Sequence, residues 1–255
     1  MENASGTGVV KRLRATAGTG GERAPDSEAS GSATLAGAVY RRLRDDIISG
    51  RLEPGSWLKL EALRQRYQIG MSPIREALSR LSSDSFVVAS ENRGFRVAEL
   101  SRDDLADLTE ARVVIECAAL RQAIAQGDER WEMGIVTAHY RLSKIDAELK
   151  ERAGELMDVW EEANGRFHDA LVAACESRWV RHFRGLLYDQ SKRYRQFSLL
   201  RSAALRAIQD EHARLMEATL AREADEAATL LESHMRATAR YVMNNIPEQP
   251  PPREA

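Results

Sequence analysis

The sequence LEALRQRYQIGMSPIREALSRL, residues 60 to 81, decides the fold of this 255-residue chain. Apolar side chains recur at helical spacing in its first half, at Leu60, Leu63 and Tyr67. Gly70 then provides a turn, and Ser72 before Pro73 has the pattern of an N-cap followed by a proline in the first helical turn. The segment therefore predicts two short helices joined by a tight turn, which is the pattern of a helix-turn-helix.

The second of these helices is predicted to be amphipathic. Its apolar stripe consists of Ile74, Ala77, Leu78 and Leu81. Its other side carries Ser72, Arg75, Glu76, Ser79 and Arg80. Hydroxyl groups and an arginine near a helix N-terminus suit phosphate oxygens and base edges, because the helix dipole and the backbone N–H groups also favour anions there. A DNA-reading helix is therefore one interpretation, and an ordinary amphipathic helix with a solvated charged face is the other.

The residues that follow favour the DNA-reading interpretation. The runs SFVVAS at 85–90 and GFRVA at 94–98 are β-like, and the turn between them ends in Gly94, which suits a hairpin. A first helix is expected to begin at Leu35, where an apolar stripe of period four starts. We therefore predict a winged helix-turn-helix domain over residues 35–100.

These segments resemble the GntR family of bacterial transcription regulators. The matching stretches are ISGRLEPGSWL at 48–58, PIREAL at 73–78, and NRGF at 92–95 with Val97. The resemblance implies a winged domain that contacts double-stranded DNA through Ser72, Arg75, Ser79, Arg80, Arg93 and Gly94. Gly70 and Met71 stand where the family typically has a serine and an arginine, so the operator is expected to differ from the family's common one.

The remainder of the chain is predicted to be helical. From 101 to 245 it contains no proline and no strand-like run, and Ser101 with Asp104 resembles a capping box. Helices are expected over 101–126, 128–149, 154–174, 178–199, 202–221 and 224–244, forming an all-α antiparallel bundle. The predicted fold class is thus mainly α, a winged domain plus a helical bundle, with tails at 1–34 and 246–255 that are expected to be disordered.

Composition and charge constrain the class of protein. The chain is 43% hydrophobic, yet no apolar run approaches the roughly 18 residues that a membrane span needs, and no signal peptide is evident, so a cytoplasmic protein is expected. Residues 35–100 carry 11 Lys or Arg against 8 Asp or Glu, whereas residues 101–255 carry 22 against 27. The first part would attract phosphate, and an excess this small favours a dimer that doubles it.

Three histidines in the bundle are candidate metal ligands. His168 lies one helical turn after Asn164, while His212 and His234 are on two predicted helices joined by a short loop. Three imidazoles and one oxygen ligand would suit Zn²⁺, Ni²⁺ or Mn²⁺. The spacing alone leaves the alternative of scattered histidines that bind no metal.

The bundle also resembles the FCD effector domain found in FadR-type members of the GntR family. The matching residues are LTEAR at 108–112 with Glu116, Asn164 with Phe167 and His168, Glu211 with His212, and the stretch 225–234. The resemblance implies a divalent metal, expected to be zinc, with Asn164, His168, His212 and His234 as ligands. It also implies a small organic acid as effector.

A cationic partner for that acid is expected from Arg112 first and from Arg195 second. Tyr194, beside Arg195, is expected to contact the acid as well. The alternative for each arginine is a structural salt bridge inside the bundle. An amide oxygen such as that of Asn164 binds a divalent cation less strongly than a carboxylate does, so a weaker metal site is expected.

The sequence therefore predicts a ligand-responsive transcription regulator, not an enzyme. It is expected to act as a repressor and a homodimer that reads a palindromic operator. One alternative is a regulator that senses the metal ion itself. A metal-dependent hydrolase is the other, but the chain has no HExxH pattern and only Glu211 as an obvious base.

Overall fold

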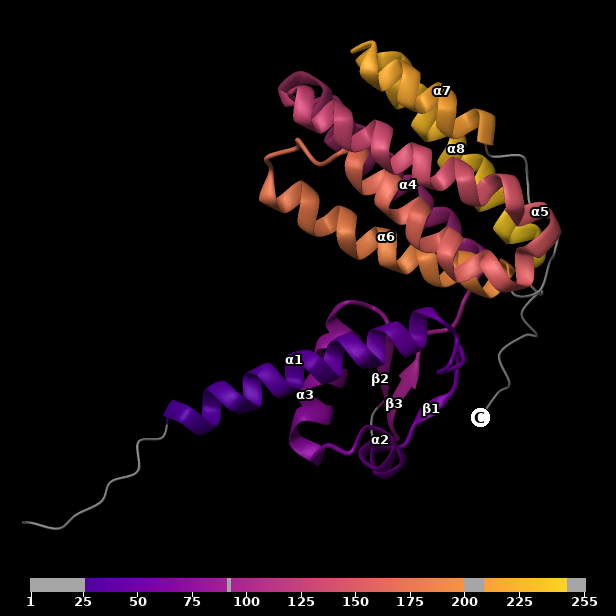
Figure 1. Ribbon diagram of the computed structural model, residues 1–255. Helices are drawn as coiled ribbons and strands as arrows, with labels where there is room; N and C mark the ends of the chain where they lie inside the picture. Colours follow the sequence, from indigo (N-terminus) through magenta and orange to yellow (C-terminus); the bar gives the residue numbers. More distant parts are fainter. Residues whose placement is uncertain (1–25, 91–92, 200–208, 247–255) are drawn as a thin grey trace, which may run out of the picture.

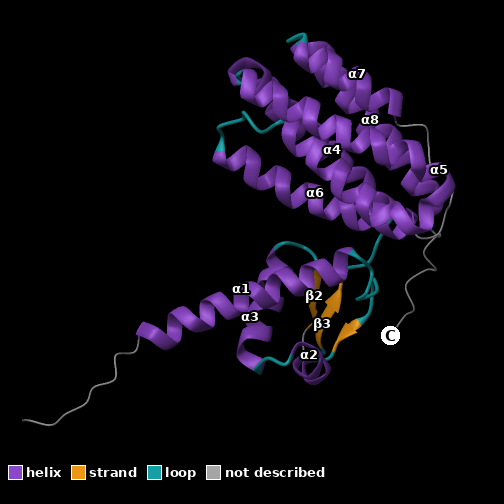
Figure 2. Cartoon of the chain, in the orientation of Figure 1, coloured by secondary structure: helices purple, strands orange, loops and turns teal. Residues whose placement is uncertain are grey.

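The computed structural model describes residues 26–90, 93–199 and 209–246. Figure 1 shows two parts, a small one that contains the sheet and a bundle of helices above it. Figure 2 shows that all strands lie in the smaller part. The predicted fold class, a winged helix-turn-helix domain plus an all-α bundle, is confirmed.

The winged domain contains three helices and a three-stranded antiparallel sheet. Its elements are α1 (Asp26–Ile48), β1 (Trp57–Leu58), α2 (Leu60–Tyr67), α3 (Met71–Ser83), β2 (Val87–Ser90) and β3 (Gly94–Val97). The strand order is β1-β3-β2, with Val87 opposite Val97 and Trp57 opposite Arg96. The predicted hairpin is therefore the wing, and β3 is its central strand.

The turn between α2 and α3 differs in detail from the prediction. Gln68, with φ of 56°, takes the left-handed conformation that ends α2, whereas Gly70 has extended backbone and is the N-cap residue of α3. Helix α3 therefore begins at Met71, and Ser72 lies inside its first turn. Pro73 permits this because the backbone N–H groups of a first turn have no partner within the helix, so proline loses nothing there.

Helix α1 begins at Asp26, earlier than the predicted start at Leu35. The sequence supplies the reason: no proline interrupts 26–48, and alanines, the best helix formers, are frequent in its first half. Helix α1 thus includes residues 26–34, which the sequence analysis assigned to the tail, while 1–25 and 247–255 lie outside the described residues. The apolar stripe of α1 packs on that of α3, and the buried side chains are Val39, Leu43, Ile47, Ile74, Ala77, Leu78 and Leu81.

Asp46 ties α1 to the segments that follow it. Its carboxylate accepts hydrogen bonds from Arg51 Nε at 2.7 Å, Arg66 Nη2 at 3.0 Å and the Tyr67 hydroxyl at 2.5 Å. Burial alone would raise the pKa of Asp46, but the bonds from Tyr67 and Arg51 outweigh it and lower the pKa. The carboxylate form is therefore the one that the folded winged domain stabilises.

The substitution Asp46→Asn is expected to lower the free energy of unfolding by about 2 kcal/mol, since hydrogen bonds to a charged group contribute about 1.5–3 kcal/mol. Because the folded pKa of Asp46 is lowered, its contribution is present above the ordinary pKa of about 3.9 and is lost as pH falls below it. Urea unfolding at pH 7 and at pH 3 measures both effects. A difference between variant and wild type that is equal at the two pH values would contradict this account.

The described residues of the bundle form five helices, and residues 202–208 of the predicted helix 202–221 lie outside the described residues. The helices are α4 (Arg102–Gln126), α5 (Glu129–Leu171), α6 (Arg178–Leu199), α7 (Gln209–Leu220) and α8 (Ala224–Asn245). Ser101 caps α4 as predicted, because its hydroxyl accepts the Asp104 N–H at 3.0 Å. None of the helices in the described ranges has the length and apolar character needed to cross a membrane.

Helix α5 reverses direction in its middle, as the two predicted helices 128–149 and 154–174 required. The backbone of Arg152 is non-helical, with φ of −129° and ψ of 32°. The indole Nε1 of Trp131 donates to the carbonyl of Ala170 at 3.0 Å, although a straight helix would separate these residues by about 58 Å. The two halves of α5 therefore lie antiparallel, and the second half carries part of the candidate site.

Helix α6 connects the two parts of the molecule. Leu186 packs against the core of the winged domain, whereas Leu187 packs with Leu100 and Val242 in a cluster at the base of the bundle. The main bundle core surrounds Phe167, which is fully buried, and it includes the reduced thiols Cys117 and Cys175. Phe167 leads directly to the candidate site, since its ring touches two of the three predicted histidine ligands.

Candidate functional site

The structure brings the three predicted histidines together inside the bundle. His168 comes from the second half of α5, His212 from α7 and His234 from α8, and all three are buried. Their ligand nitrogens lie within 4.8 Å of one another. The ring centroids are 4.9 Å apart for His212 and His234, 5.2 Å for His168 and His234, and 5.5 Å for His168 and His212. This spacing is that of side chains able to share one ion.

Neighbouring side chains orient the imidazoles. Nδ1 of His234 lies 2.7 Å from Oε2 of Glu211, so this nitrogen donates to the carboxylate and Nε2 is the nitrogen through which His234 would ligate. The ring of Phe167 meets His168 and His212 edge-on, with centroids 5.6 and 5.2 Å away. Glu211, the only base candidate for a hydrolase, is thus engaged in holding His234.

The protonation state of the cluster also suits metal binding. Burial lowers the pKa of His168 well below its ordinary value, and the nearby His234 and His212 lower it further. His168 is therefore neutral at pH 7, which is the form of imidazole that ligates a metal.

Asn164 provides the test of whether the residues fit an ion. It is buried, one turn before His168 on α5, and its Oδ1 accepts no hydrogen bond from the residues that the structure describes. A buried acceptor without a donor costs about 1–3 kcal/mol, and a cation would supply the missing partner. Three imidazole nitrogens and one amide oxygen fit a divalent ion, which would provide open coordination positions for anionic oxygens.

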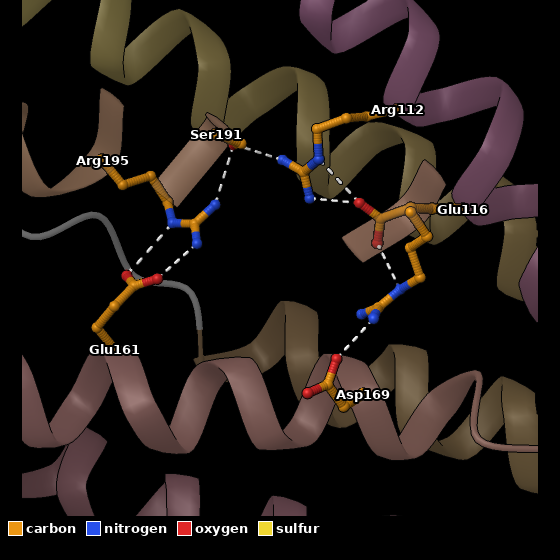
Figure 3. A network of polar contacts seen from close by, with 7 residues as sticks. Arg112, Glu116, Glu161, Asp169, Ser191 and Arg195 are labelled. Carbon is orange, nitrogen blue, oxygen red and sulfur yellow. Dashed lines mark hydrogen bonds and ion pairs between the residues drawn. The ribbon is translucent and has the colours of Figure 1, made fainter. Parts of the chain in front are cut away.

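Figure 3 shows a network of buried ion pairs. It lies near His168, because the charges of Arg184 and Arg112 contribute to lowering the pKa of that histidine. Arg112 of α4 binds Glu116 at 2.6 and 2.8 Å, and Arg195 of α6 binds Glu161 at 2.5 and 3.3 Å. The hydroxyl of Ser191 accepts from both arginines, at 2.6 Å from Arg112 and 3.0 Å from Arg195. Both predicted effector arginines therefore lie together, and each already has a carboxylate partner.

Arg184 is a third buried arginine in this network. Its Nη1 donates to Asp169 at 2.6 Å and its Nε lies 3.6 Å from Glu116, but its Nη2 has no hydrogen-bond partner within the described ranges. Glu116 and Glu161 are buried, whereas the side chain of Asp169 is 65% exposed and thus screened by solvent. Three buried guanidinium groups against two buried carboxylates leave an excess of positive charge.

Tyr188 stands among the three arginines. The guanidinium groups of Arg112, Arg184 and Arg195 lie 5.6, 5.5 and 4.9 Å from its ring centre. Its hydroxyl is buried and makes no hydrogen bond to any described residue. Gly165 provides the room for it, because a Cβ at that position would lie 3.1 Å from the Tyr188 hydroxyl oxygen.

A cavity of about 310 Å³ opens beside these groups, lined by Tyr188, Arg184, Glu161, Gly165 and Lys192 among others. Arg184 and Tyr188 are site residues that the sequence analysis missed. A signal for them exists, since residues 184, 188, 191 and 195 recur on one face of α6.

The structure places Tyr194 outside this network, contrary to its predicted position beside an effector. Its ring is fully buried with Leu100 and Leu105, and its hydroxyl donates to Asp104 and accepts the Ser101 N–H at 3.3 Å. Neighbours on a helix point about 100° apart, so Tyr194 faces away from the arginines that Arg195 joins. Tyr188, which shares the face of α6 that carries Arg195, is the tyrosine that lies among the arginines.

The predicted DNA-contacting residues are all exposed on the winged domain. They are exposed on α3 at Ser72, Arg75, Ser79 and Arg80, and at the wing at Arg93 and Gly94. Arg75 makes no ion pair with the described residues, whereas Arg80 stacks on the ring of Tyr40 at 4.7 Å. Gly94 has φ of 89°, a conformation that favours glycine and lets the hairpin turn sharply.

Comparison with known proteins agrees with both parts. The model of bacterial regulatory proteins of the gntR family matches residues 35–97, and the FCD domain model matches residues 107–237. The HTH-type transcriptional regulator BphR of Paraburkholderia xenovorans (strain LB400) is 39% identical over 82% of this chain and 85% of its own length. The HTH-type transcriptional repressor GlaR of Escherichia coli (strain K12) is 34% identical over 77% of this chain and 90% of its own.

Solved structures share the fold. E. coli McbR/YncC superposes with a TM-score of 0.70 at 19% identity, covering 82% of this chain and 97% of that one. A GntR transcriptional regulator from Rhodococcus sp. RHA1 gives 0.65 at 22% identity, over 86% and 100% of the two chains. The chain therefore belongs to the GntR family of DNA-binding transcription regulators and carries an FCD effector domain.

Proposed function

We propose that this regulator is a repressor whose bundle binds a small organic acid through a divalent metal, and whose winged domains bind a palindromic operator as a homodimer. One observation carries the proposal: three buried histidines converge, with the unsatisfied oxygen of Asn164 one helical turn before His168 and buried guanidinium groups close enough to lower the pKa of His168. Zinc is the expected ion, with nickel or manganese as alternatives. As a bacterial transcription regulator that binds DNA, the protein would act in the cytoplasm.

The acid's carboxylate would take the coordination positions that the four ligands leave open. Arg112 and Arg195 already have carboxylate partners, so they contribute mainly positive charge to the pocket. Among the described residues of the network, Nη2 of Arg184 and the hydroxyl of Tyr188 still have hydrogen bonds to give. These two donors would bind other oxygens of the acid, because a buried donor without a partner is costly.

The DNA-binding arrangement follows from α3 and the charge of the winged domain. Residues 35–100 have only three more basic than acidic side chains, so a dimer would double a weak attraction to phosphate. Two copies related by a twofold axis would place two α3 helices in successive major grooves, which requires a palindromic site. Repression is supported by the name of the relative GlaR, a transcriptional repressor.

The substitution Arg75→Ala tests this function. Arg75 is exposed on α3 and is free to reach a base edge, so its loss should cost about 1–3 kcal/mol of operator binding, roughly 5- to 150-fold in affinity. The experiment is selection of fragments from the source organism's sheared genomic DNA by the purified protein, followed by affinity measurement at fixed salt.

Arg121→Ala is the matched control, since Arg121 is an exposed arginine of α4 with only an exposed partner, Asp225. Wild type and the control should recover a few fragments that share a palindrome, and Arg75→Ala should lose them. Equal recovery by Arg75→Ala would refute the role of Arg75. Recovery of bulk DNA alone by the wild type would refute operator-specific binding.

A further inference from the structure

Helix α6 presents one side to the candidate effector site and another to the winged domain. Tyr188, Ser191 and Arg195 belong to the arginine network. The residues between them cross to the other part of the molecule: Asp189 pairs with Arg44 of α1 at 3.0 Å, and the side-chain amide of Gln190 donates to the Asp84 carbonyl at 2.6 Å. A displacement of α6 would therefore affect both the arginine network and the winged domain.

Asp84, which ends α3, connects Gln190 to Tyr40. Its carboxylate accepts the Tyr40 hydroxyl at 2.5 Å, while its backbone N–H bonds back to the Arg80 carbonyl. The guanidinium group of Arg80 lies 4.7 Å above the ring of Tyr40, and that of Arg44 lies 6.0 Å from the same ring. Tyr40 is therefore the side chain on which the contacts from α6 and a DNA-facing arginine meet.

We propose that Tyr40 is a positioning residue for Arg80, and that the chain of contacts from Gln190 through Asp84 to Tyr40 lets α6 set how Arg80 meets DNA. The inference rests on the proposed function for the role of Arg80 at an operator. It adds a residue outside α3 and the wing to those that determine DNA affinity, and it names the contacts by which the bundle reaches them.

Stacking on Tyr40 orders the Arg80 side chain before it meets DNA. A free arginine loses much rotamer freedom when it binds, so stacking it in advance reduces that cost. The flat face of an aromatic ring holds a guanidinium group through the cation–π interaction, which a side chain of similar size without a ring does not provide. The Tyr40 hydroxyl fixes the ring in turn, because its bond to Asp84 leaves one orientation. A shift of α6 by about 1 Å would lengthen the Gln190 bond beyond hydrogen-bonding distance and release Asp84.

The test uses full-length protein and the operator fragment that wild type selects. Tyr40→Leu should weaken operator binding about 3- to 10-fold, whereas Tyr40→Phe, which keeps the ring face and loses only the bond to Asp84, should weaken it about 2- to 3-fold. In an Arg80→Ala background, Tyr40→Leu should have no further effect, because the interaction that it removes is already gone. Thermal unfolding of each variant accompanies the affinities, so that a loss caused by misfolding is recognised.

The link to α6 is tested by Gln190→Leu, whose side chain cannot donate to Asp84. It should weaken operator binding about 2- to 3-fold with Arg80 present and not at all in the Arg80→Ala background. Additive effects of the Tyr40 and Arg80 substitutions, or an equal loss in Tyr40→Phe and Tyr40→Leu, would overturn the positioning role of Tyr40. An effect of Gln190→Leu that persists without Arg80 would overturn the link. Failure of wild type to select any fragment would instead refute the proposed function, on which the inference rests.

Discussion

Replacement of His212 by alanine is expected to lower the affinity of the protein for Zn²⁺ at least 100-fold. His212 is fully buried, and its ligand nitrogens lie within 4.8 Å of those of His168 and His234. Even the loss of a group that only orients a ligand costs about 10- to 100-fold, so removing a ligand should cost more. Competition with a chromophoric chelator at pH 7 measures the affinity directly in the full-length protein.

Two further variants make the experiment specific. His139→Ala removes an imidazole that also packs on Phe167, at 5.5 Å, but lies outside the three-histidine cluster, so its Zn²⁺ affinity should match wild type. Glu211→Gln should give an intermediate loss of about 10- to 100-fold, because it weakens the bond that orients His234. Equal affinity of His212→Ala and His139→Ala for Zn²⁺ would show that the histidines are packing residues.

The same proteins separate an acid sensor from a sensor of the metal itself. An effector acts only through its different affinity for the two states of the regulator. If the ion is the signal, Zn²⁺ alone should change operator affinity in wild type and not in His212→Ala. If the ion is instead a permanent part of an acid-binding pocket, Zn²⁺ alone should leave operator affinity unchanged. An added carboxylic acid should then alter operator affinity only in the metal-loaded protein.

Much of the fold could be predicted because its helices and strands are marked by patterns of residues close together in the sequence. The apolar stripes of α1 and α3, the turn before Gly94 and the cap at Ser101 are all patterns of neighbouring residues. The predicted helix boundaries were wrong where several neighbouring residues suit the same turn or cap position equally well. Gln68 rather than Gly70 takes the left-handed position, and Pro73 is acceptable anywhere in a first turn. The sequence therefore predicted a start of α3 at Pro73, two residues after the observed start at Met71.

The candidate site was predicted less completely, since contacts between helices are not local. The histidine trio could be anticipated from an approximate depth along antiparallel helices together with the family resemblance. Tyr188 and Arg184 could not be chosen over Tyr194, because which face of α6 meets the pocket depends on how that helix is rotated against α4 and α5. The periodicity of 184, 188, 191 and 195 identifies a face, but only the packed bundle shows what that face meets.

The substitution Glu116→Gln is expected to lower the free energy of unfolding of the bundle by about 3–5 kcal/mol. Glu116 is 1% exposed and lies between Arg112 and Arg184, so the neutral amide would leave two buried guanidinium groups without their shared counter-charge. Breaking a buried ion pair by removing one partner costs about this much. Urea unfolding of wild type and variant at pH 7 measures the difference.

Glu232→Gln is the matched control, because Glu232 forms an i,i+4 pair with Arg236 while its side chain is 44% exposed. Exposed pairs contribute about 0–1 kcal/mol, so this variant should have nearly the same free energy of unfolding as wild type.

The pH dependence of stability gives a second check. Burial alone would raise the pKa of Glu116, but the charges of Arg112 and Arg184 outweigh it and lower the pKa. The contribution of Glu116 is therefore present above the ordinary glutamate pKa of about 4.3 and should disappear as pH falls below it, which brings the stabilities of wild type and Glu116→Gln together. A variant as stable as wild type at pH 7 would mean that the three arginines need no fixed counter-charge, and the case for an anion-binding pocket built from them would fail with it.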